Sequence, residues 1–239
     1  MFTLRPARIY QPGDIVCFSS VHFKSASTFV QGVQVISGIA KLPIAAAALP
    51  LSGVASLINE RRTNLVNITI HTANIHHVGI VVKESRSGDM IHATSGGITS
   101  AQANEGDGPG RIFRCTVGHV ARGAAEVASK WANRRATGVR NKYSFTTAAL
   151  AALRPSFYGP LAMANANRYY QFRDTIGGPD GWVANNNDMF CAEFVIACYQ
   201  AYLGAEHSFT YMAKDATNTL PATLASWLES SSVWGEPFR

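Results

Sequence analysis

The chain has 239 residues, of which 47% are hydrophobic and 15% are charged, and its formal net charge is +6 at pH 7. This composition supplies enough apolar side chains for one sizeable core and excludes a largely disordered protein. The positive charge favours a polyanionic neighbourhood such as cell wall or anionic lipid. Nucleic-acid binding is not expected, because the cations are scattered and no basic stripe with interleaved aromatic residues is present.

The length suits a single domain over residues 1–239 that carries an insertion. Residues 11–18 resemble a turn followed by a short strand, and residues 24–64 form an insertion rich in Ala, Gly and Ser. Its most apolar part, 33–58, is interrupted by two prolines and a lysine, so we expect a buried helical hairpin. A membrane-touching element is the alternative. The first residues do not have the pattern of a secretory signal, which predicts synthesis in the cytoplasm.

Two strand-like runs follow at 65–70 and 78–82, and a turn at 85–89 leads into Met90-Ile91-His92-Ala93. The second run and this last segment predict an antiparallel hairpin with one histidine in each arm, His77 and His92. Side chains alternate along a strand, so these two histidines can point to one face and form a hydrogen bond. His76 is the rival of His77, because a one-residue shift of register reverses the facing.

Further along, residues 112–117 have the composition of a strand, and apolar residues at helical spacing predict a helix over 120–136. Residues 143–153 also resemble a helix. The stretch 155–188 is rich in Gly, Asn and Pro, which predicts a long irregular connection over the surface.

Near the end of the chain, Cys191 opens an apolar run that predicts a helix to about Tyr202, with Gly204 as its stop. A last helical turn or two is expected from Leu220. The chain has four cysteines, too few and too dispersed for a disulfide framework: Cys17, Cys115, Cys191 and Cys198.

Cys191, His77 and His92 together are the components of a cysteine hydrolase. A helix N-terminus and a neighbouring imidazolium both favour the thiolate, which is the form that attacks carbonyl carbon. We expect Cys191 to act as nucleophile, His77 as base, and His92 to orient His77. Backbone N–H groups at the start of the helix are candidates for oxyanion stabilisation. Glu193 either caps the helix N-terminus or binds substrate.

Other interpretations remain open from the residues alone. Cys191 could be a buried structural thiol, and His92 a solvent-facing strand residue. A zinc site made of His77, His92 and Cys191 has acceptable ligand types but lacks a closely spaced ligand pair, so we expect neither a metal nor another cofactor. The remaining histidines have no motif around them and are expected to be structural or exposed: His22, His71, His119 and His207.

The motifs resemble those of the NlpC/P60 cysteine peptidases. The corresponding segments are Gly13-Asp14-Ile15-Val16, then His77-Val78-Gly79-Ile80, then Ile91-His92-Ala93 with Gly96-Gly97-Ile98. In that family the nucleophile helix normally precedes these segments. Here Phe190-Cys191-Ala192-Glu193-Phe194-Val195 follows them, which is similar to the circularly permuted branch, although Ala192 replaces the usual serine. Pro221-Ala222-Thr223-Leu224 is similar to the proline-led segment that closes permuted members.

The resemblance implies an α+β fold of permuted papain-like type, with a small antiparallel sheet of four to six strands packed on the Cys191 helix. It also implies cleavage of an amide bond, with peptidoglycan stem peptides as the leading substrate. A toxin delivered by a bacterial secretion apparatus into a target periplasm, with a neutralising immunity protein in the producer, is consistent with this reading. The alternatives are an acyl hydrolase or transferase acting on lipid esters or amides, and a non-catalytic binding module.

Overall fold

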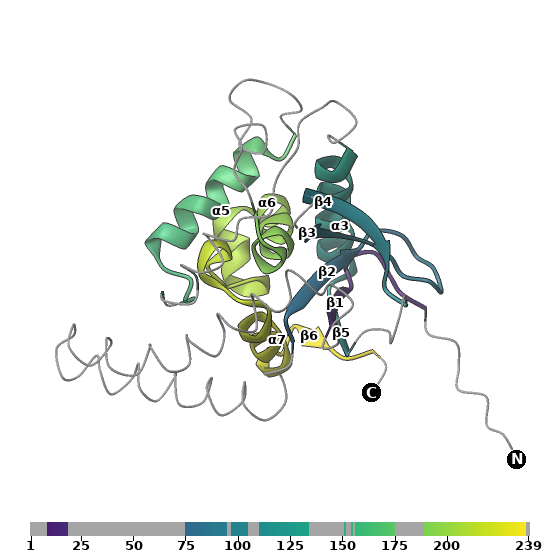
Figure 1. Cartoon of the computed structure of the whole chain (residues 1–239). Coiled ribbons are helices and arrows are strands. Elements are labelled where there is room, and N and C mark those ends of the chain that lie inside the picture. The colour runs from purple at the N-terminus through teal and green to yellow at the C-terminus, as the bar shows by residue number, and fades with distance from the viewer. Residues whose placement is uncertain are drawn as a thin grey trace, which may run out of the picture.

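An antiparallel sheet with helices packed beside it makes up the described part of the molecule (Figure 1). The computed structural model describes residues 9–18, 75–94, 97–104, 110–133, 151, 154, 156–174 and 189–237. Within these residues the sheet has six strands in the spatial order β4-β3-β2-β1-β5-β6. The strands are β1 (Ile15–Phe18), β2 (His77–Val81), β3 (Asp89–Thr94), β4 (Gly97–Gln102), β5 (Arg111–Cys115) and β6 (Trp234–Gly235).

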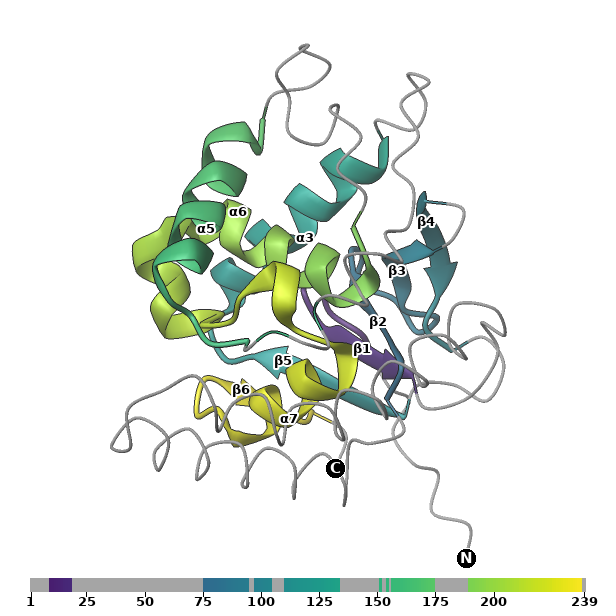
Figure 2. The ribbon, with the colours of Figure 1, turned by 60° about the vertical axis from the view of Figure 1, so that its left-hand side comes forward.

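The described helices are α3 (Gly118–Asn133), α5 (Pro160–Phe172), α6 (Cys191–Tyr211) and α7 (Pro221–Ser230), with a short 3₁₀ helix η3 (Ala216–Asn218). Helix α6 packs against β2 and β3 and also against α3, while α5 lies along the other side of α6 (Figure 2). Helix α7 contacts the last strand, β6. The protein is therefore α+β, and α6 contacts both the sheet and the helices α3, α5 and α7. None of the described helices is both long and apolar enough to cross a membrane.

The two faces of the sheet carry different sets of side chains, because successive residues of a strand point to opposite sides. On one face, which we call the helix-covered face, Val78, Ile80 and Ile91 join the main core with α3 and α6. On the other face, which we call the second face, Phe18, Val81 and Met90 belong to a smaller cluster. Burying both faces explains why β2 is apolar at every position except its histidine and its glycine.

The turn before β1 ties the sheet to its neighbours. Gly13 has a positive φ of 89°, and a Cβ there would lie 2.3 Å from the Ala121 carbonyl oxygen of α3, so only glycine fits. Its own carbonyl oxygen accepts a hydrogen bond from the Tyr199 hydroxyl of α6. Asp14 binds the Arg114 guanidinium of β5 through two hydrogen bonds of 2.7 Å. The Gly-Asp pair thus connects β1 to α3, α6 and β5.

The predicted hairpin, the strand at 112–117 and the helix at 120–136 are all present, as β2–β3, β5 and α3. The predicted irregular connection over 155–188 is wrong in its first half, because α5 occupies 160–172. Pro160 begins this helix, where the missing N–H of proline does no harm. A narrow stripe of buried residues, Ala162, Ala166 and Tyr169, packs against α6.

The predicted end of the Cys191 helix is only partly right. Gly204 has φ 70° and ψ 177°, so it does interrupt the helical geometry. The helix resumes after it and ends at Tyr211. Likewise α7 runs for ten residues rather than a turn or two. The predicted helical insertion at 24–64, the strand at 65–70 and all but one residue of the helix at 143–153 lie outside the described residues.

Candidate active site

The two histidines of the hairpin meet on the second face of the sheet. Antiparallel pairing aligns Ile80 with Ile91 and Val81 with Met90, and continuing this register places His92 opposite Gly79. His77 lies two residues before Gly79, so its side chain is the diagonal neighbour of His92 on the same face. Nε2 of His77 and Nδ1 of His92 are 2.8 Å apart, and the rings are nearly perpendicular. The hydrogen bond predicted from the sequence is present.

Gly79 makes room for this pair. A Cβ at this position would lie 3.3 Å from the Cβ of His92 and 2.9 Å from the sulfur of Met90. A larger residue would therefore press on His92 from directly across the strand pair. The glycine of the His-Val-Gly-Ile segment thus lets His92 lean toward His77.

Burial controls the protonation of both rings. His77 is 3% exposed and His92 1% exposed. Burial lowers the pKa of His77 well below its usual value, and the nearby rings of His92 and His76 lower it further. Burial likewise lowers the pKa of His92 to about 4. At neutral pH both imidazoles are therefore uncharged, the form in which histidine acts as a base.

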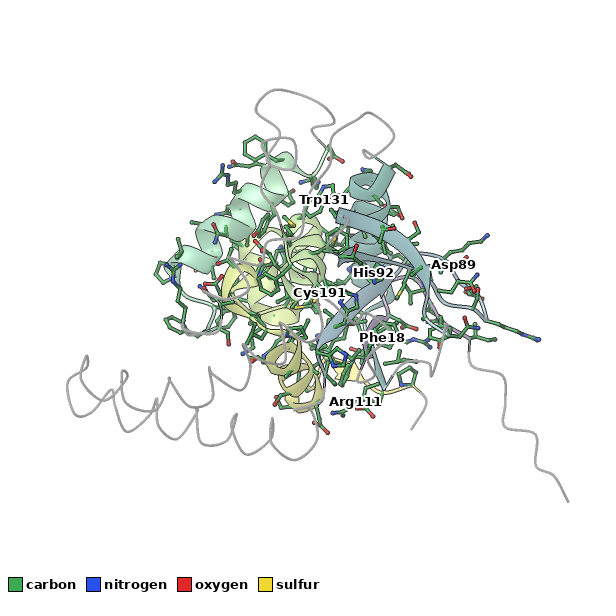
Figure 3. All side chains as sticks on the ribbon, in the orientation of Figure 1. Phe18, Asp89, His92, Arg111, Trp131 and Cys191 are labelled. Atoms are coloured by element: carbon green, nitrogen blue, oxygen red, sulfur yellow. The ribbon has the colours of Figure 1, made fainter. Side chains whose placement is uncertain are left out.

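Cys191 is the first residue of α6 and is completely buried. It belongs to the same core cluster as Cys17 of β1 and Val78 of β2, which are cross-strand partners. Burial raises the pKa of Cys17, and the Cys191 thiol is one of the neighbours that raise it further. Cys191 therefore lies against the β1–β2 pair, and Val78 directly follows His77. Helix α6, which begins with Cys191, contacts β3, which carries His92 (Figure 3). The thiol belongs to the core of the helix-covered face, whereas the His92 ring lies on the second face.

The start of α6 has an unusual cap. Phe190 is the N-cap residue, and it provides no side-chain oxygen to bind the N–H groups of the first turn. These N–H groups have no acceptor within the helix by position. Instead the carboxyl group of Glu193 accepts a hydrogen bond from the Phe190 N–H. Of the two roles predicted for Glu193, the structure supports helix capping.

The structure pairs His77, rather than its rival His76, with His92. His76 is also buried, and its backbone N–H donates to the Phe18 carbonyl at 3.2 Å. The aromatic ring of Phe18 lies beside His77, with 6.0 Å between ring centroids. This neighbour was not anticipated, although alternation along Ile15–Phe18 puts residue 18 on the second face.

The other cysteines and histidines have simpler surroundings. All four cysteines are free and buried, so exposure does not distinguish Cys191 from Cys17, Cys115 or Cys198. His119 and His207 are exposed, and His22 and His71 lie outside the described residues. Within the described part of the chain, no three His, Cys, Asp or Glu side chains group so that they could hold a metal ion.

The arrangement provides a buried thiol at a helix start and a bonded pair of neutral imidazoles on the strands against which that helix packs. Such groups can supply a nucleophile, a base and an orienting acceptor. Comparison of the chain with models of protein families, with curated proteins and with solved structures finds no match.

Proposed function

We propose that the protein is a cysteine hydrolase in which Cys191 is the nucleophile, His77 the base and His92 the residue that orients the base. The observation that carries the proposal is the buried hydrogen bond of 2.8 Å between His77 and His92, on the two strands against which the helix that begins with Cys191 packs. Burial removes the solvation of both histidines and shifts their pKa values, and shifted pKa values of this kind gather at functional sites.

We propose one tautomer of this pair, and that tautomer gives each nitrogen of His77 a role. When Nε2 donates its proton to Nδ1 of His92, the other nitrogen, Nδ1, carries the lone pair and is the one that takes a proton. Transfer of the Cys191 proton to this nitrogen would give a thiolate and an imidazolium, and it requires the thiol and the His77 ring to meet at the end of β2 where His77 lies. His92 stabilises that imidazolium by accepting its Nε2 proton, as a carboxylate or amide oxygen does in other triads.

The thiolate then attacks an amide carbonyl carbon. A carbon–sulfur bond forms and the carbonyl oxygen becomes an oxyanion, which the N–H groups at the start of α6 are positioned to stabilise. When the carbon–nitrogen bond breaks, His77 returns its proton to the departing amine. Water then attacks the thioester with His77 again as base, which releases the acid and regenerates the thiol.

The favoured substrate is an amide bond of peptidoglycan stem peptides. Two features support this class: the resemblance of the three motifs to NlpC/P60 peptidases, and a net charge of +6 that suits an anionic cell wall. Cys191 and both histidines are buried, so substrate must displace covering groups to reach the thiol.

The test is mass spectrometry of purified sacculi incubated with the protein and with two variants. Wild type should release muropeptides with newly formed stem-peptide termini, and Cys191→Ala should release none. Cys198→Ala is the matched control, because it removes a second buried thiol two turns along α6 and should retain cleavage. Cleavage by Cys191→Ala at the wild-type rate, or no cleavage by wild type, contradicts the proposal. Hydrolysis of lipid esters or amides with sacculi left intact would move the substrate to the lipid class.

A delivered antibacterial toxin with a neutralising partner is the biological setting that we propose for such an enzyme. Expression directed to the periplasm of a sensitive bacterium should cause lysis with wild type and not with Cys191→Ala. Survival of cells that export wild type, or equal lysis by Cys191→Ala, argues against this setting.

A further inference from the structure

Glu193 is a buried acid two residues after the proposed nucleophile. It is 3% exposed and occupies the third position of α6, while Cys191 occupies the first. Its carboxyl group reaches back to the N–H of Phe190, the residue before the helix. This is half of a capping box, the arrangement in which the third helical residue binds the N–H of the N-cap residue.

Glu193 differs from a capping residue on the surface because it is buried among other side chains. Two elements packed against α6 contribute titratable groups near it. Asp215, at the start of η3, and the Tyr169 hydroxyl, on α5, both interact electrostatically with Glu193. Arg168 of α5 acts on Tyr169, and Lys214 is buried next to Asp215. Among the described residues, the second carboxyl oxygen of Glu193, Oε2, is buried and has no hydrogen-bond partner.

We propose that Glu193 is a positioning residue for Cys191: its carboxyl group fixes the first turn of α6 and thereby the thiol and the N–H groups beside it. The inference rests on the proposed function, since it adds Glu193 to the site of Cys191, His77 and His92. The N-cap residue makes no side-chain hydrogen bond to the first turn, so among the described residues the Glu193 carboxyl group is the side chain shown to cap the start of α6.

The charge of Glu193 matters as much as its position. Burial raises the pKa of Glu193 to about 8; the Phe190 hydrogen bond lowers it and Asp215 raises it. At neutral pH the side chain is therefore an uncharged acid that holds the helix start without placing a negative charge beside the thiolate. Above about pH 8 it ionises, and a buried carboxylate two residues from Cys191 disfavours the thiolate.

The experiment compares Glu193→Gln and Glu193→Ala with wild type, with Glu126→Gln as the control. Glutamine keeps an acceptor oxygen but cannot ionise, whereas alanine removes both. Glu126 is an exposed acid on α3 and has no part in the site. Three quantities are measured from pH 6 to pH 10: the rate of Cys191 alkylation by iodoacetamide, the rate of sacculus cleavage, and hydrogen exchange of the Phe190 amide.

With Glu193→Gln we expect alkylation and cleavage close to wild type at pH 7. The ratio of variant to wild-type rate should then increase above pH 8, approaching about tenfold for each unit by which the carboxylate raises the thiol pKa. Glu193→Ala should be severalfold slower than Glu193→Gln at every pH, and its Phe190 amide should exchange faster. Glu126→Gln should match wild type throughout.

Two results overturn the inference: identical pH profiles for wild type and Glu193→Gln, or equal rates and equal Phe190 exchange for Glu193→Ala and Glu193→Gln. Failure of the proposed function looks different. In that case no variant cleaves sacculi, while the Phe190 exchange still separates alanine from glutamine.

Discussion

The two faces of the five-residue strand β2 carry different kinds of residues. Val78 and Ile80 point to the helix-covered face and join the core under α6, whereas His77 and Gly79 point to the second face, with His92. Alternation along a strand separates the two sets completely. The histidines share the second face with Phe18, Val81 and Met90, whereas the core under α6 takes only apolar residues from β2. Substitutions on the two faces should consequently affect different properties.

The largest expected effect comes from adjacent residues on opposite faces. His77→Ala should reduce sacculus cleavage by about 10² to 10⁴-fold, the contribution of a general base, with little loss of stability. Val78→Ala should instead lower the free energy of unfolding and leave the activity of the folded protein within a fewfold of wild type. Activity assays and urea unfolding of both variants test this. Equal activity of the two variants would remove His77 from the mechanism.

Ile80→Ala probes the helix-covered face more deeply. Ile80 is fully buried among core residues, and truncating such a side chain lowers the free energy of unfolding by about 2–5 kcal/mol. Urea denaturation measures the loss. Below the melting temperature of the variant, its cleavage rate per folded molecule should persist. A loss of cleavage without a loss of stability would show that the two faces are not separable.

The second face should make the protein sensitive to acid. An unfolded histidine binds a proton near pH 6.5, but folded His92 does so only near pH 4, so between these values the unfolded state holds more protons. The contribution of His92 to the free energy of unfolding is therefore fully present above pH 6.5. It is lost as the pH drops through this window, by up to about 3 kcal/mol. His77, whose pKa is also lowered, acts in the same direction.

Thermal unfolding between pH 4 and pH 8 measures this acid sensitivity. His92→Gln should flatten the profile of wild type, while the exposed His119→Gln should reproduce it. A His92→Gln profile as steep as that of wild type would mean that other groups cause the acid sensitivity.

Gly79→Ala should have the smallest effect on stability, about 1 kcal/mol, because the added methyl first meets the flexible Met90 side chain. It also presses on His92, so we expect the cleavage rate to fall by more than the stability change explains. Steady-state kinetics together with unfolding curves separate the two effects. A variant with full activity would show that His92 needs no room on this side.

Much of the hairpin was predictable because its signals are local. Alternating apolar residues, a turn ending in Gly88-Asp89 and one histidine in each arm determine both the pairing and the shared face. The position of Cys191 at a helix start was predictable for the same reason, since the apolar run begins there. The contact of Cys191 with the β1–β2 pair depends on how α6 packs, which no local pattern contains.

The wrong predictions for α5 and for the end of α6 concern segments in which the decisive residues are small. Ala162 and Ala166 give α5 a buried stripe too weakly hydrophobic to stand out among the surrounding Gly, Asn and Pro residues. Gly204 was predicted to end α6, and it does break the helical geometry, but the helix resumes and continues to Tyr211. A glycine alone does not show whether the chain leaves the helix or continues it. The proximity of Tyr169 and Asp215 to Glu193 could not be predicted, because both residues are distant from Glu193 in the sequence.

The hydrogen bond between Tyr199 and Gly13 bears on the order of folding. It joins residues 186 positions apart, and the strand next to it, β1, lies between β2 and β5, in the interior of the sheet. Strand β1 cannot pair on both sides until β5 has been synthesised. The hydrogen bond from Tyr199 cannot form until α6 has been synthesised as well. Such long-range contacts slow the search for the native state. We therefore expect the sheet to assemble late, after most of the chain has left the ribosome.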